Sequence, residues 1–162
     1  FVVINKDKSF RPILDLSILN KLLVIPSFKM ETVSKISVGI VDSLWGCTLD
    51  LTSAYFHVPM GWTFQKFLAF VVDDQIYVFQ YLPFGLSTGP WAFTRVIKPI
   101  KGYLHRLKIM IHSFLDDFLL LHGTQEGLRE VTSVVLSLFE KLGFRVNFKK
   151  SLLTPSQTVK YL

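Results

Sequence analysis

Two adjacent aspartates interrupt an apolar run in the stretch HSFLDDFLLL, residues 112–121, and they constrain the fold more than any other feature of the sequence. A carboxylate in apolar surroundings is unfavourable unless hydrogen bonds, an opposite charge or a metal ion compensates it. A second pair, Asp73-Asp74, separates two apolar and aromatic runs in FLAFVVDDQIYVFQYL. Because Asp is a common turn residue, this second pair predicts a β-hairpin with a solvated turn. Asp116 and Asp117 have the same simple explanation unless a partner elsewhere in the chain sets them apart.

A third carboxylate, Asp50, also follows apolar residues, in CTLDL, with no turn former beside it. Side chains alternate along a strand, so if Asp116 points toward Asp50, Asp117 should point elsewhere unless the hairpin bend turns it. Converging carboxylates repel one another, which raises a pKa. A divalent cation removes this repulsion, and Mg²⁺ prefers hard oxygen ligands. The three aspartates are consistent with a nucleotidyl-transfer site; buried structural aspartates and plain turns are the alternatives.

The composition narrows the class of protein. The chain has 162 residues, of which 50% are hydrophobic and 19% charged, so we expect one domain with a sizeable core and no extended disorder. Its net charge of +6 suits a polyanionic partner, although an ordinary solvated surface would give the same charge. The single cysteine excludes an internal disulfide. No signal peptide or membrane-spanning stretch is visible, so we expect no membrane partner and an intracellular location, in the cytoplasm or nucleus.

Strand and helix patterns interleave along the chain, which predicts an α+β fold with helices on one face of an antiparallel sheet. The expected strands are two around the basic turn of FVVINKDKSFRPILDL, one ending near Asp50, the hairpin of Asp73-Asp74, FRVNF and a final TVKYL. A short helix is expected over residues 29–36. A longer one should follow LPFGLSTGP, with Pro90 in its first turn and Pro99 kinking or ending it. Thr124 should cap an amphipathic helix that buries Leu128, Val131, Val135, Leu138 and Leu142 and stops at Gly143.

The ordered segments LDLTSAYF, LPFGLSTGP, FLDD, LGFRVNFKKS and VKYL resemble the successive motifs of reverse transcriptases, and RPILDLSILNK resembles the fingers segment before them. IPSFKMETV and KKSLLTPSQTVKYL resemble the tyrosine-recombinase (DIRS-like) retrotransposon type. The resemblance implies a right-hand polymerase, with fingers at about residues 1–48 and 62–90 and palm at about 49–61 and 91–162. It also implies a single partial domain without thumb or RNase H, cut from a longer polyprotein that carries a thumb, an RNase H and a recombinase.

The same resemblance assigns residues to metal binding. Asp50 and Asp116 match the principal metal ligands, Asp117 the neighbouring and less directly engaged carboxylate, and Leu51 a residue whose backbone carbonyl touches the metal. The implied cofactor is two Mg²⁺ ions, with Mn²⁺ as a substitute.

Other positions match substrate-binding roles. Tyr55 matches the steric gate against a ribose 2′-hydroxyl, with a core aromatic as its alternative, and Arg11 with Lys6 matches the triphosphate-binding pair. Phe84, Gly85 and Pro90 match the loop beneath nucleotide and template. Lys150 matches a proton donor to pyrophosphate, with a solvated lysine as its alternative. Phe114 departs from the family, which usually has tyrosine two positions before the aspartate pair.

The implied activity is RNA-directed DNA polymerisation in retrotransposon replication, in which a primer on an RNA or DNA template is extended with a dNTP. We expect residues 1–162 alone to be poorly active, because nothing in them clamps the duplex opposite the palm. One alternative is a catalytically silent reverse-transcriptase-like module that only binds nucleic acid. Another is a small RNA-recognition fold, which would leave Asp50 far from Asp116.

Overall fold

The computed structural model describes residues 2–4, 10–31 and 43–162, and the chain divides into two compact units. One unit comprises residues Phe1–Phe28 and Tyr55–Phe93, and the other comprises Lys29–Ala54 and Thr94–Leu162. Each unit is described by itself. No helix within the described ranges is long and apolar enough to span a membrane.

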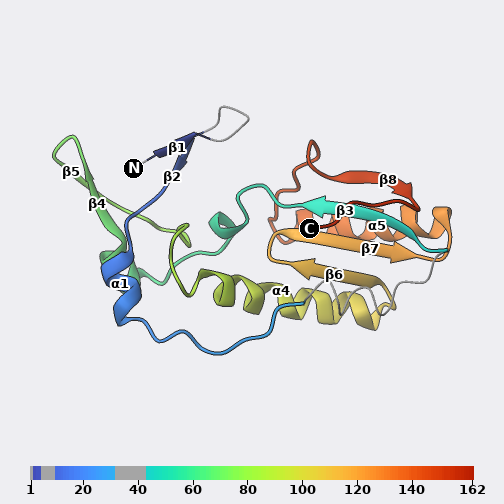
Figure 1. Ribbon diagram of the computed structural model, residues 1–162, viewed down its shortest axis with the longest axis horizontal. Helices are drawn as coiled ribbons and strands as arrows, with labels where there is room; N and C mark the ends of the chain where they lie inside the picture. The colour runs from blue at the N-terminus through green and yellow to red at the C-terminus, as the bar shows by residue number, and fades with distance from the viewer. Residues whose placement is uncertain (1, 5–9, 32–42) are drawn as a thin grey trace. The chain divides into compact units, whose positions relative to one another are not determined.

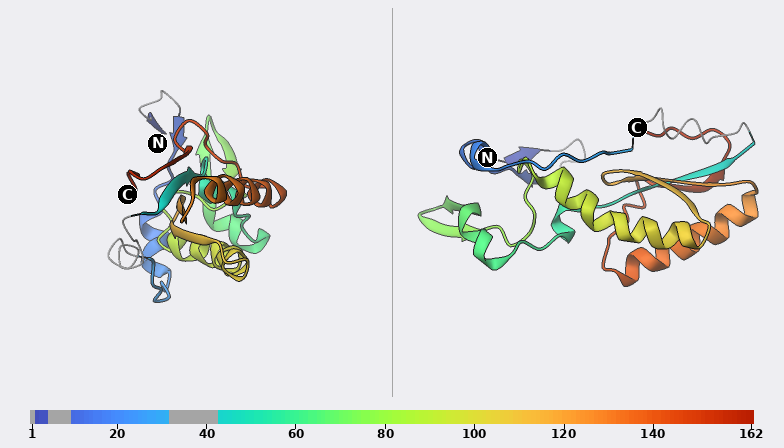
Figure 2. Two further views of the ribbon diagram at one scale, coloured as in Figure 1. Left: turned by 90° about the vertical axis from the view of Figure 1, so that its right-hand side faces the viewer. Right: turned by 90° about the horizontal axis from the view of Figure 1, so that it is seen from below.

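The second unit is built on a four-stranded antiparallel sheet with the order β6-β7-β3-β8 (Figure 1). Its strands are β3 (Trp45–Asp50), β6 (Met110–Phe114), β7 (Asp117–His122) and β8 (Leu152–Ser156). Helix α5 (Gln125–Lys141) contacts β3, β7 and β8, and Figure 2 shows the second half of α4 (Gly89–Arg106) on the same side of the sheet. This arrangement confirms the predicted α+β fold with an antiparallel sheet backed by helices.

The main core of this unit lies between the sheet and α5. Cys47 and Leu49 of β3 alternate with polar positions and are almost fully buried, as are their register partners Leu120 and Phe118 in β7. The Phe118 ring packs edge-on against Phe139 of α5, with ring centroids 5.0 Å apart. Burial of large aromatic surfaces of this kind dominates the energetics of a small core.

The opposite face of the sheet is covered by the last residues of the chain. Leu119 and Leu121 form a small cluster with Leu44, Val159 and Tyr161. A Cβ atom at Gly46 would lie 2.8 Å from Val159 Cγ2, so only glycine admits the segment this close to β3. Asp50 and Asp117 belong to this face, because they alternate with the residues that face α5.

Both long helices begin where the sequence predicts. The Thr124 side chain accepts a hydrogen bond from the Gly127 amide at 3.2 Å and caps α5. The buried residues of α5 are Leu128, Thr132, Val135 and Phe139. Of the other residues predicted to be core, Val131 and Leu138 are only partly buried, and the prediction for Leu142, which is 50% exposed, is wrong. Helix α4 continues through Pro99 to Arg106, so this proline does not end it.

The first unit contains two hairpins. Strands β1 (Val2–Ile4) and β2 (Phe10–Pro12) pair as predicted, and β4 (Ala69–Val72) pairs with β5 (Gln75–Val78) around Asp73 and Asp74. Both turn aspartates have positive φ angles, 49° and 60°, as a type I′ hairpin turn requires. The remaining elements, which the sequence analysis missed, are α1 (Ser17–Leu22), η1 (Ala54–His57, whose first residue belongs to the second unit), α3 (Trp62–Gln65) and η2 (Lys66–Leu68).

Two predicted strands near the end of the chain are wrong. FRVNF contributes only an isolated bridge between Val146 and Leu51, because residues 147–150 turn to lead into β8. The last strand is residues 152–156 rather than TVKYL, and its Pro155 is tolerated because β8 lies at the edge of the sheet. Of the helix expected over residues 29–36, positions 29–31 are not helical and the others lie outside the described residues.

Candidate active site

The candidate site is built where the β6–β7 hairpin meets the end of β3. Phe114 pairs with Asp117, so Leu115 and Asp116 form a two-residue turn. The Leu51 amide donates to the Asp116 carbonyl at 3.1 Å, which makes Asp50 and Asp117 the next pair along the ladder. The Asp50 amide donates to Ser151 Oγ at 3.0 Å rather than to β7, so the Asp50–Asp117 pair is not hydrogen-bonded. Side chains at such positions approach each other most closely.

The register therefore brings the three predicted carboxylates together. Asp117, rather than Asp116, is the cross-strand partner of Asp50, while Asp116 occupies the turn itself. The separation of Asp50 from Asp116 that the RNA-recognition alternative requires is not observed. Which of Asp116 and Asp117 engages a metal more directly stays a prediction.

Mutual repulsion is visible in the electrostatics of the three aspartates. Burial raises the pKa of Asp117 above its usual value, and the charges of Asp116 and Asp50 raise it further. The pKa of Asp50 is also raised, by burial and by Asp116, against the opposing effects of the Lys150 charge and the Asn147 side chain. Two carboxylates held in this way favour a bound cation or a proton between them.

A tight turn after α5 supports Asp50 from the other side. The Asn147 amide donates to the Asp50 carbonyl at 2.8 Å, and Ser151 Oγ donates to the Asn147 carbonyl at 2.8 Å. The same turn carries Lys150, whose positive charge partly offsets the rise in the pKa of both Asp50 and Asp117. Lys150 is thus in electrostatic reach of the carboxylates, as a proton donor in the site would be. Asn147 and Ser151 were missed in the sequence, where Asn147 was assigned to the expected strand FRVNF.

The donor set fits a divalent cation as an open site. Among the described residues, no group of three or more His, Cys, Asp or Glu side chains is arranged to hold a metal ion, so the protein could supply at most two carboxylates at one time. Mg²⁺ commonly uses one or two carboxylates and completes its shell with substrate phosphates and water, so a pair of facing aspartates is sufficient. The Leu51 side chain is buried, and only its backbone could contribute.

Phe114 lies at the end of β6, opposite Asp117, and its side chain is partly buried. The hydroxyl that the family usually carries at this position is absent from the sequence. A different hydroxyl reaches the hairpin instead, because Tyr161 Oη donates to the Asp117 carbonyl at 3.2 Å.

The first unit holds a second group of predicted residues. The Tyr55 ring stacks on Phe84, with centroids 5.2 Å apart, and packs against Gly89, where a Cβ atom would lie 3.2 Å from the ring. Gly85 has a φ of +94°, which glycine tolerates readily. The start of α4 is thereby shaped around one aromatic ring.

Asn20 fixes this loop and was missed in the sequence. Its Nδ2 donates to the Gly85 carbonyl at 2.8 Å, and its Oδ1 accepts from the Ser87 amide at 2.8 Å. An asparagine in the apolar segment LSILNKLL is the signal that could have found it. Of the predicted triphosphate contacts, Arg11 lies in β2 opposite Val3, and Lys6 lies outside the described residues.

Comparisons with known proteins agree with this architecture. The sequence model of the family described as reverse transcriptase (RNA-dependent DNA polymerase) matches residues 3–162. Protein P of heron hepatitis B virus is 28% identical over 116 residues, covering 71% of this chain and 15% of Protein P. The Gag-Pro-Pol polyprotein of human T-cell leukemia virus 2 is 25% identical over 119 residues, covering 68% of this chain and 8% of the polyprotein.

The structure of a foamy viral protease-reverse transcriptase in complex with double-stranded DNA superposes with a TM-score of 0.85. It is 23% identical and covers 99% of this chain and 28% of that chain. A second structure of the foamy viral protein, in complex with an RNA/DNA hybrid, gives a TM-score of 0.77 at 24% identity, covering 94% of this chain and 20% of that chain. The fold is therefore shared with these structures, while the chain spans less than a third of their length.

Proposed function

Because the chain belongs to the reverse transcriptase (RNA-dependent DNA polymerase) family, we propose that it forms the fingers and palm of an active RNA-directed DNA polymerase. The observation that carries this proposal is the register of β3 with β7, which sets Asp50 opposite Asp117 beside the turn that holds Asp116. Three carboxylates that repel one another at the end of a sheet are costly for folding alone and useful for cation-dependent chemistry.

In the proposed reaction the primer 3′-hydroxyl attacks the α-phosphate of a dNTP, a new phosphodiester bond forms and pyrophosphate leaves. Asp50, Asp116 and Asp117 would hold two Mg²⁺ ions, or Mn²⁺ in their place, which supply charge stabilisation for such an in-line displacement. Lys150 Nζ would give a proton to the departing pyrophosphate. Its electrostatic influence on Asp50 and Asp117 supports that role.

Substrate selection would fall to residues of the first unit. Tyr55 would bar a ribose 2′-hydroxyl, since its ring is braced by Phe84 and by the start of α4. Phe84 and Gly85 would pack beneath the nucleotide, and Arg11 and Lys6 would bind its triphosphate, for which a guanidinium fork is well suited. In the second unit, Phe114 would pack near the primer.

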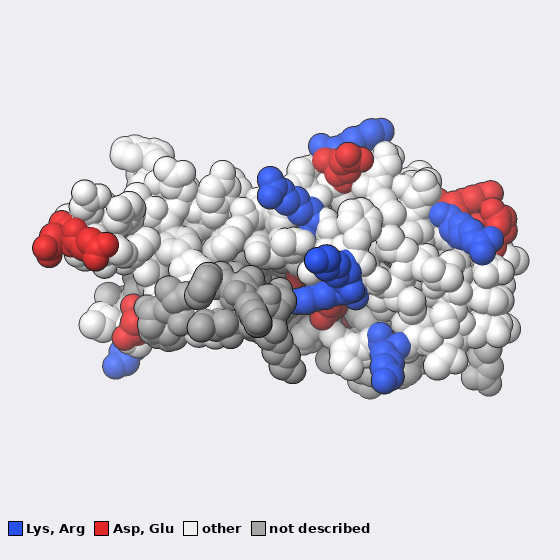
Figure 3. All heavy atoms as spheres, turned by 90° about the horizontal axis from the view of Figure 1, so that it is seen from above, with Lys and Arg blue, Asp and Glu red and all other residues white. Residues whose placement is uncertain are grey.

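The template would be RNA or DNA annealed to a primer. The net charge of +6 favours a polyanion. On the face seen in Figure 3 the lysine and arginine side chains form separate spots, several beside acidic residues, rather than a continuous band. We propose that phosphate contacts are distributed over the surface and that a thumb from the same polyprotein completes the clamp.

We also propose an origin in a retrotransposon of the tyrosine-recombinase (DIRS-like) type, acting inside the cell in the cytoplasm or nucleus. The segments IPSFKMETV and KKSLLTPSQTVKYL support this origin. The sequence that flanks this chain in its genome tests it. A neighbouring tyrosine recombinase and RNase H would support the assignment, and an integrase or a viral envelope gene would contradict it.

Primer extension tests the activity. Asp116→Asn, in a polypeptide that continues beyond Leu162, should reduce Mg²⁺-dependent extension on an RNA template by at least about 10²-fold, because a lost charge-stabilising group costs that much or more. The matched control is Asp73→Asn, which removes one carboxylate from the other Asp-Asp hairpin and should leave the rate unchanged. Residues 1–162 alone should extend poorly.

The outcomes separate the alternatives. Template binding without Mg²⁺-dependent extension would identify a silent nucleic-acid-binding module. An unchanged rate in Asp116→Asn, or an equal loss in Asp73→Asn, would contradict a specific role for Asp116.

A further inference from the structure

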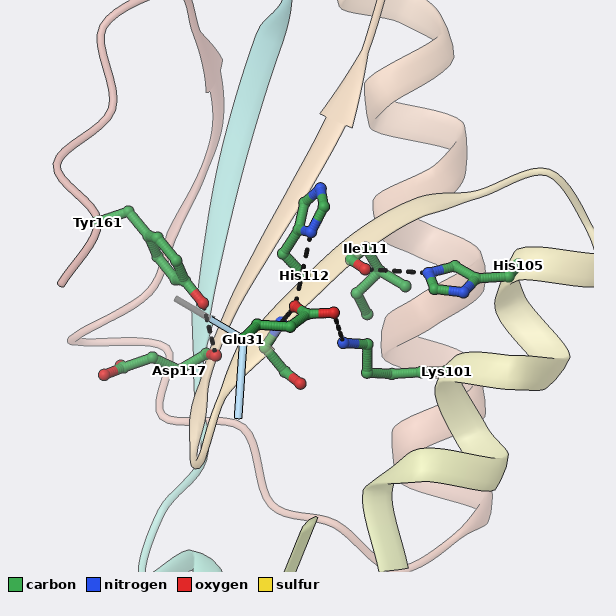
Figure 4. A network of polar contacts seen from close by, with 8 residues as sticks. Glu31, Lys101, His105, Ile111, His112, Asp117 and Tyr161 are labelled. Carbon is green, nitrogen blue, oxygen red and sulfur yellow. Dashed lines mark hydrogen bonds and ion pairs between the residues drawn. The ribbon is translucent and has the colours of Figure 1, made fainter. Parts of the chain in front are cut away.

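The Glu31 carboxylate joins three parts of the second unit (Figure 4). Its Oε1 accepts a hydrogen bond from Lys101 Nζ of α4 at 2.5 Å. Its Oε2 accepts from the Ser113 backbone amide of β6 at 2.9 Å and lies 3.5 Å from His112 Nδ1. Glu31 itself lies in an irregular segment, so its position is set by these contacts rather than by a helix or strand.

The contact with Ser113 falls on the outer edge of β6. Among residues 2–4, 10–31 and 43–162, strand β6 is the last strand of its sheet and pairs only with β7. Along this edge the Ile111 carbonyl bonds to His105 Nε2 at 3.1 Å, and the Ser113 amide bonds to Glu31. Backbone groups at a sheet edge need such partners when they are shielded from water. At this position the Glu31 carboxylate therefore supplies the acceptor that a neighbouring strand would otherwise supply.

That position is three residues before Asp116. The strand that Glu31 holds runs directly into the turn of Leu115 and Asp116, and Leu115 carries a φ of 52° that leucine rarely adopts. A turn in an unfavourable conformation persists only when its surroundings fix both of its arms. Strand β3 fixes the β7 arm, and His105 and Glu31 support the outer edge of the β6 arm.

We propose that Glu31 is a positioning residue for the catalytic hairpin, holding the end of β6 so that Asp116 and Asp117 are presented in register with Asp50. This inference rests on the proposed polymerase function. Glu31 would not touch substrate or metal, and its effect would pass through the Ser113 amide. Lys101, whose side chain is only 13% exposed, holds the carboxylate in place from the opposite side.

The experiment must separate this role from a simple contribution to folding. Replacing Glu31 alone leaves the Lys101 ammonium nearly buried without its partner, which is destabilising in itself. Replacing both, as Glu31→Met with Lys101→Met, removes the unpaired charge and tends to restore stability. The double variant still lacks an acceptor for the Ser113 amide. Stability and positioning therefore respond differently to the same pair of substitutions.

We expect Glu31→Met, alone and in the double variant, to increase hydrogen exchange at the Ser113 amide and in the hairpin about tenfold, because methionine offers the amide no oxygen acceptor and one hydrogen bond is lost. The kcat for primer extension should fall by about 10- to 100-fold, because small misplacements of reacting groups cost that much. The KM for dNTP should stay within about twofold. The Tm of the double variant should return close to that of the wild type. Glu126→Gln, which removes an exposed partner of Arg129, is the matched control and should change none of these.

Three results would overturn the proposal. Recovery of both kcat and Tm in the double variant would show that Glu31 acts only as the partner of Lys101 in a structural ion pair. Unchanged exchange at Ser113 in Glu31→Met would show that Glu31 does not hold the strand, and a raised KM with normal kcat would place its effect on substrate binding. If the hairpin responds as expected but the wild type shows no Mg²⁺-dependent extension, the positioning role stands and the proposed function fails.

Discussion

At the scale of single residues, the two Asp-Asp pairs of this chain show how identical dipeptides acquire different roles. Asp73 and Asp74 both occupy the left-handed region in an exposed hairpin, where aspartate is well tolerated. In the other hairpin the left-handed position falls on Leu115, which leaves Asp116 and Asp117 free to face β3. Leu115 thus adopts the strained backbone conformation, while the carboxylates of Asp116 and Asp117 lie near Asp50.

The repulsion among these carboxylates predicts that removing one stabilises the metal-free protein. A carboxyl whose pKa is higher in the folded than in the unfolded protein lowers the free energy of unfolding as the pH rises through that pKa. This destabilisation persists at neutral pH. Asp117→Asn should therefore raise the Tm at about pH 7 in EDTA, by about 2 to 4 °C if about 1 kcal/mol is recovered. Thermal unfolding by circular dichroism measures this, with Asp73→Asn as the unchanged control. A lower Tm in Asp117→Asn would contradict the repulsion.

At the scale of elements, helix α5 supports the site from beneath the sheet. Its Phe139 ring lies between Phe118, which follows Asp117, and Phe144, with centroid distances of 5.0 and 5.8 Å. This aromatic contact links the strand that carries Asp117 to the helix behind the sheet.

Truncation of this ring should be far more damaging than truncation of the helix's exposed leucine. Phe139→Ala should cost about 3–5 kcal/mol of unfolding free energy, because it opens a cavity in a closed core. Leu142→Ala should cost about 0.5 kcal/mol or less, since Leu142 is half exposed. Urea denaturation of both variants measures the difference. Similar losses of unfolding free energy in the two variants would mean that Leu142 belongs to the buried face of the helix, as the sequence pattern predicts.

The elements that could be predicted are those with a long repeat of apolar residues or with two independent sequence signals. Helix α5 has a capping Thr124 and a helical repeat over 17 residues, and the hairpins have polar breaks between apolar runs. The helix's buried stripe was misplaced at its end, because Leu142 and Phe139 lie on neighbouring positions of the same repeat. FRVNF alternates for only five residues, too few to outweigh the turn that Asn147 makes with Lys150 and Ser151.

The candidate site was predictable in its members but not in its arrangement. Register depends on which strands pair, and a shift of one residue would turn Asp117 to the opposite face. Asn20, Asn147 and Glu31 act through contacts with residues distant in the sequence, which no local pattern reveals.

At the scale of the whole molecule, the stability of the protein at acid pH should depend on the ionisation of Glu31. Burial would raise its pKa, but hydrogen bonds from His112, Lys101 and the Ser113 amide lower it from 4.5 to about 2. A carboxyl with a lowered folded pKa stabilises the protein above its unfolded pKa and loses that contribution as the pH falls. Asp50 and Asp117, whose pKa values are raised, act with the opposite sign.

Comparison with Glu31→Gln isolates this contribution. The Tm difference between wild type and Glu31→Gln should be largest above about pH 5 and should vanish as the pH falls from 4.5 to about 2. The groups facing Glu31 are Lys101 and His112, with Tyr161 close enough that the Glu31 charge helps raise its pKa. Thermal melts across this pH range measure the difference. A gap that stays constant down to pH 2 would contradict the lowered pKa.

The close approach of Val159 to Gly46 has a consequence for judging related sequences. A side chain at position 46 would collide with Val159 Cγ2, and moving the terminal segment to relieve this collision would also move the Tyr161 hydroxyl that bonds to the Asp117 carbonyl. Damage at one end of β3 would thus be transmitted to the carboxylates at the other end. A gene copy that keeps all three aspartates can therefore be silent, and inheritance of activity must be traced through an inconspicuous glycine as well as through the acidic triad.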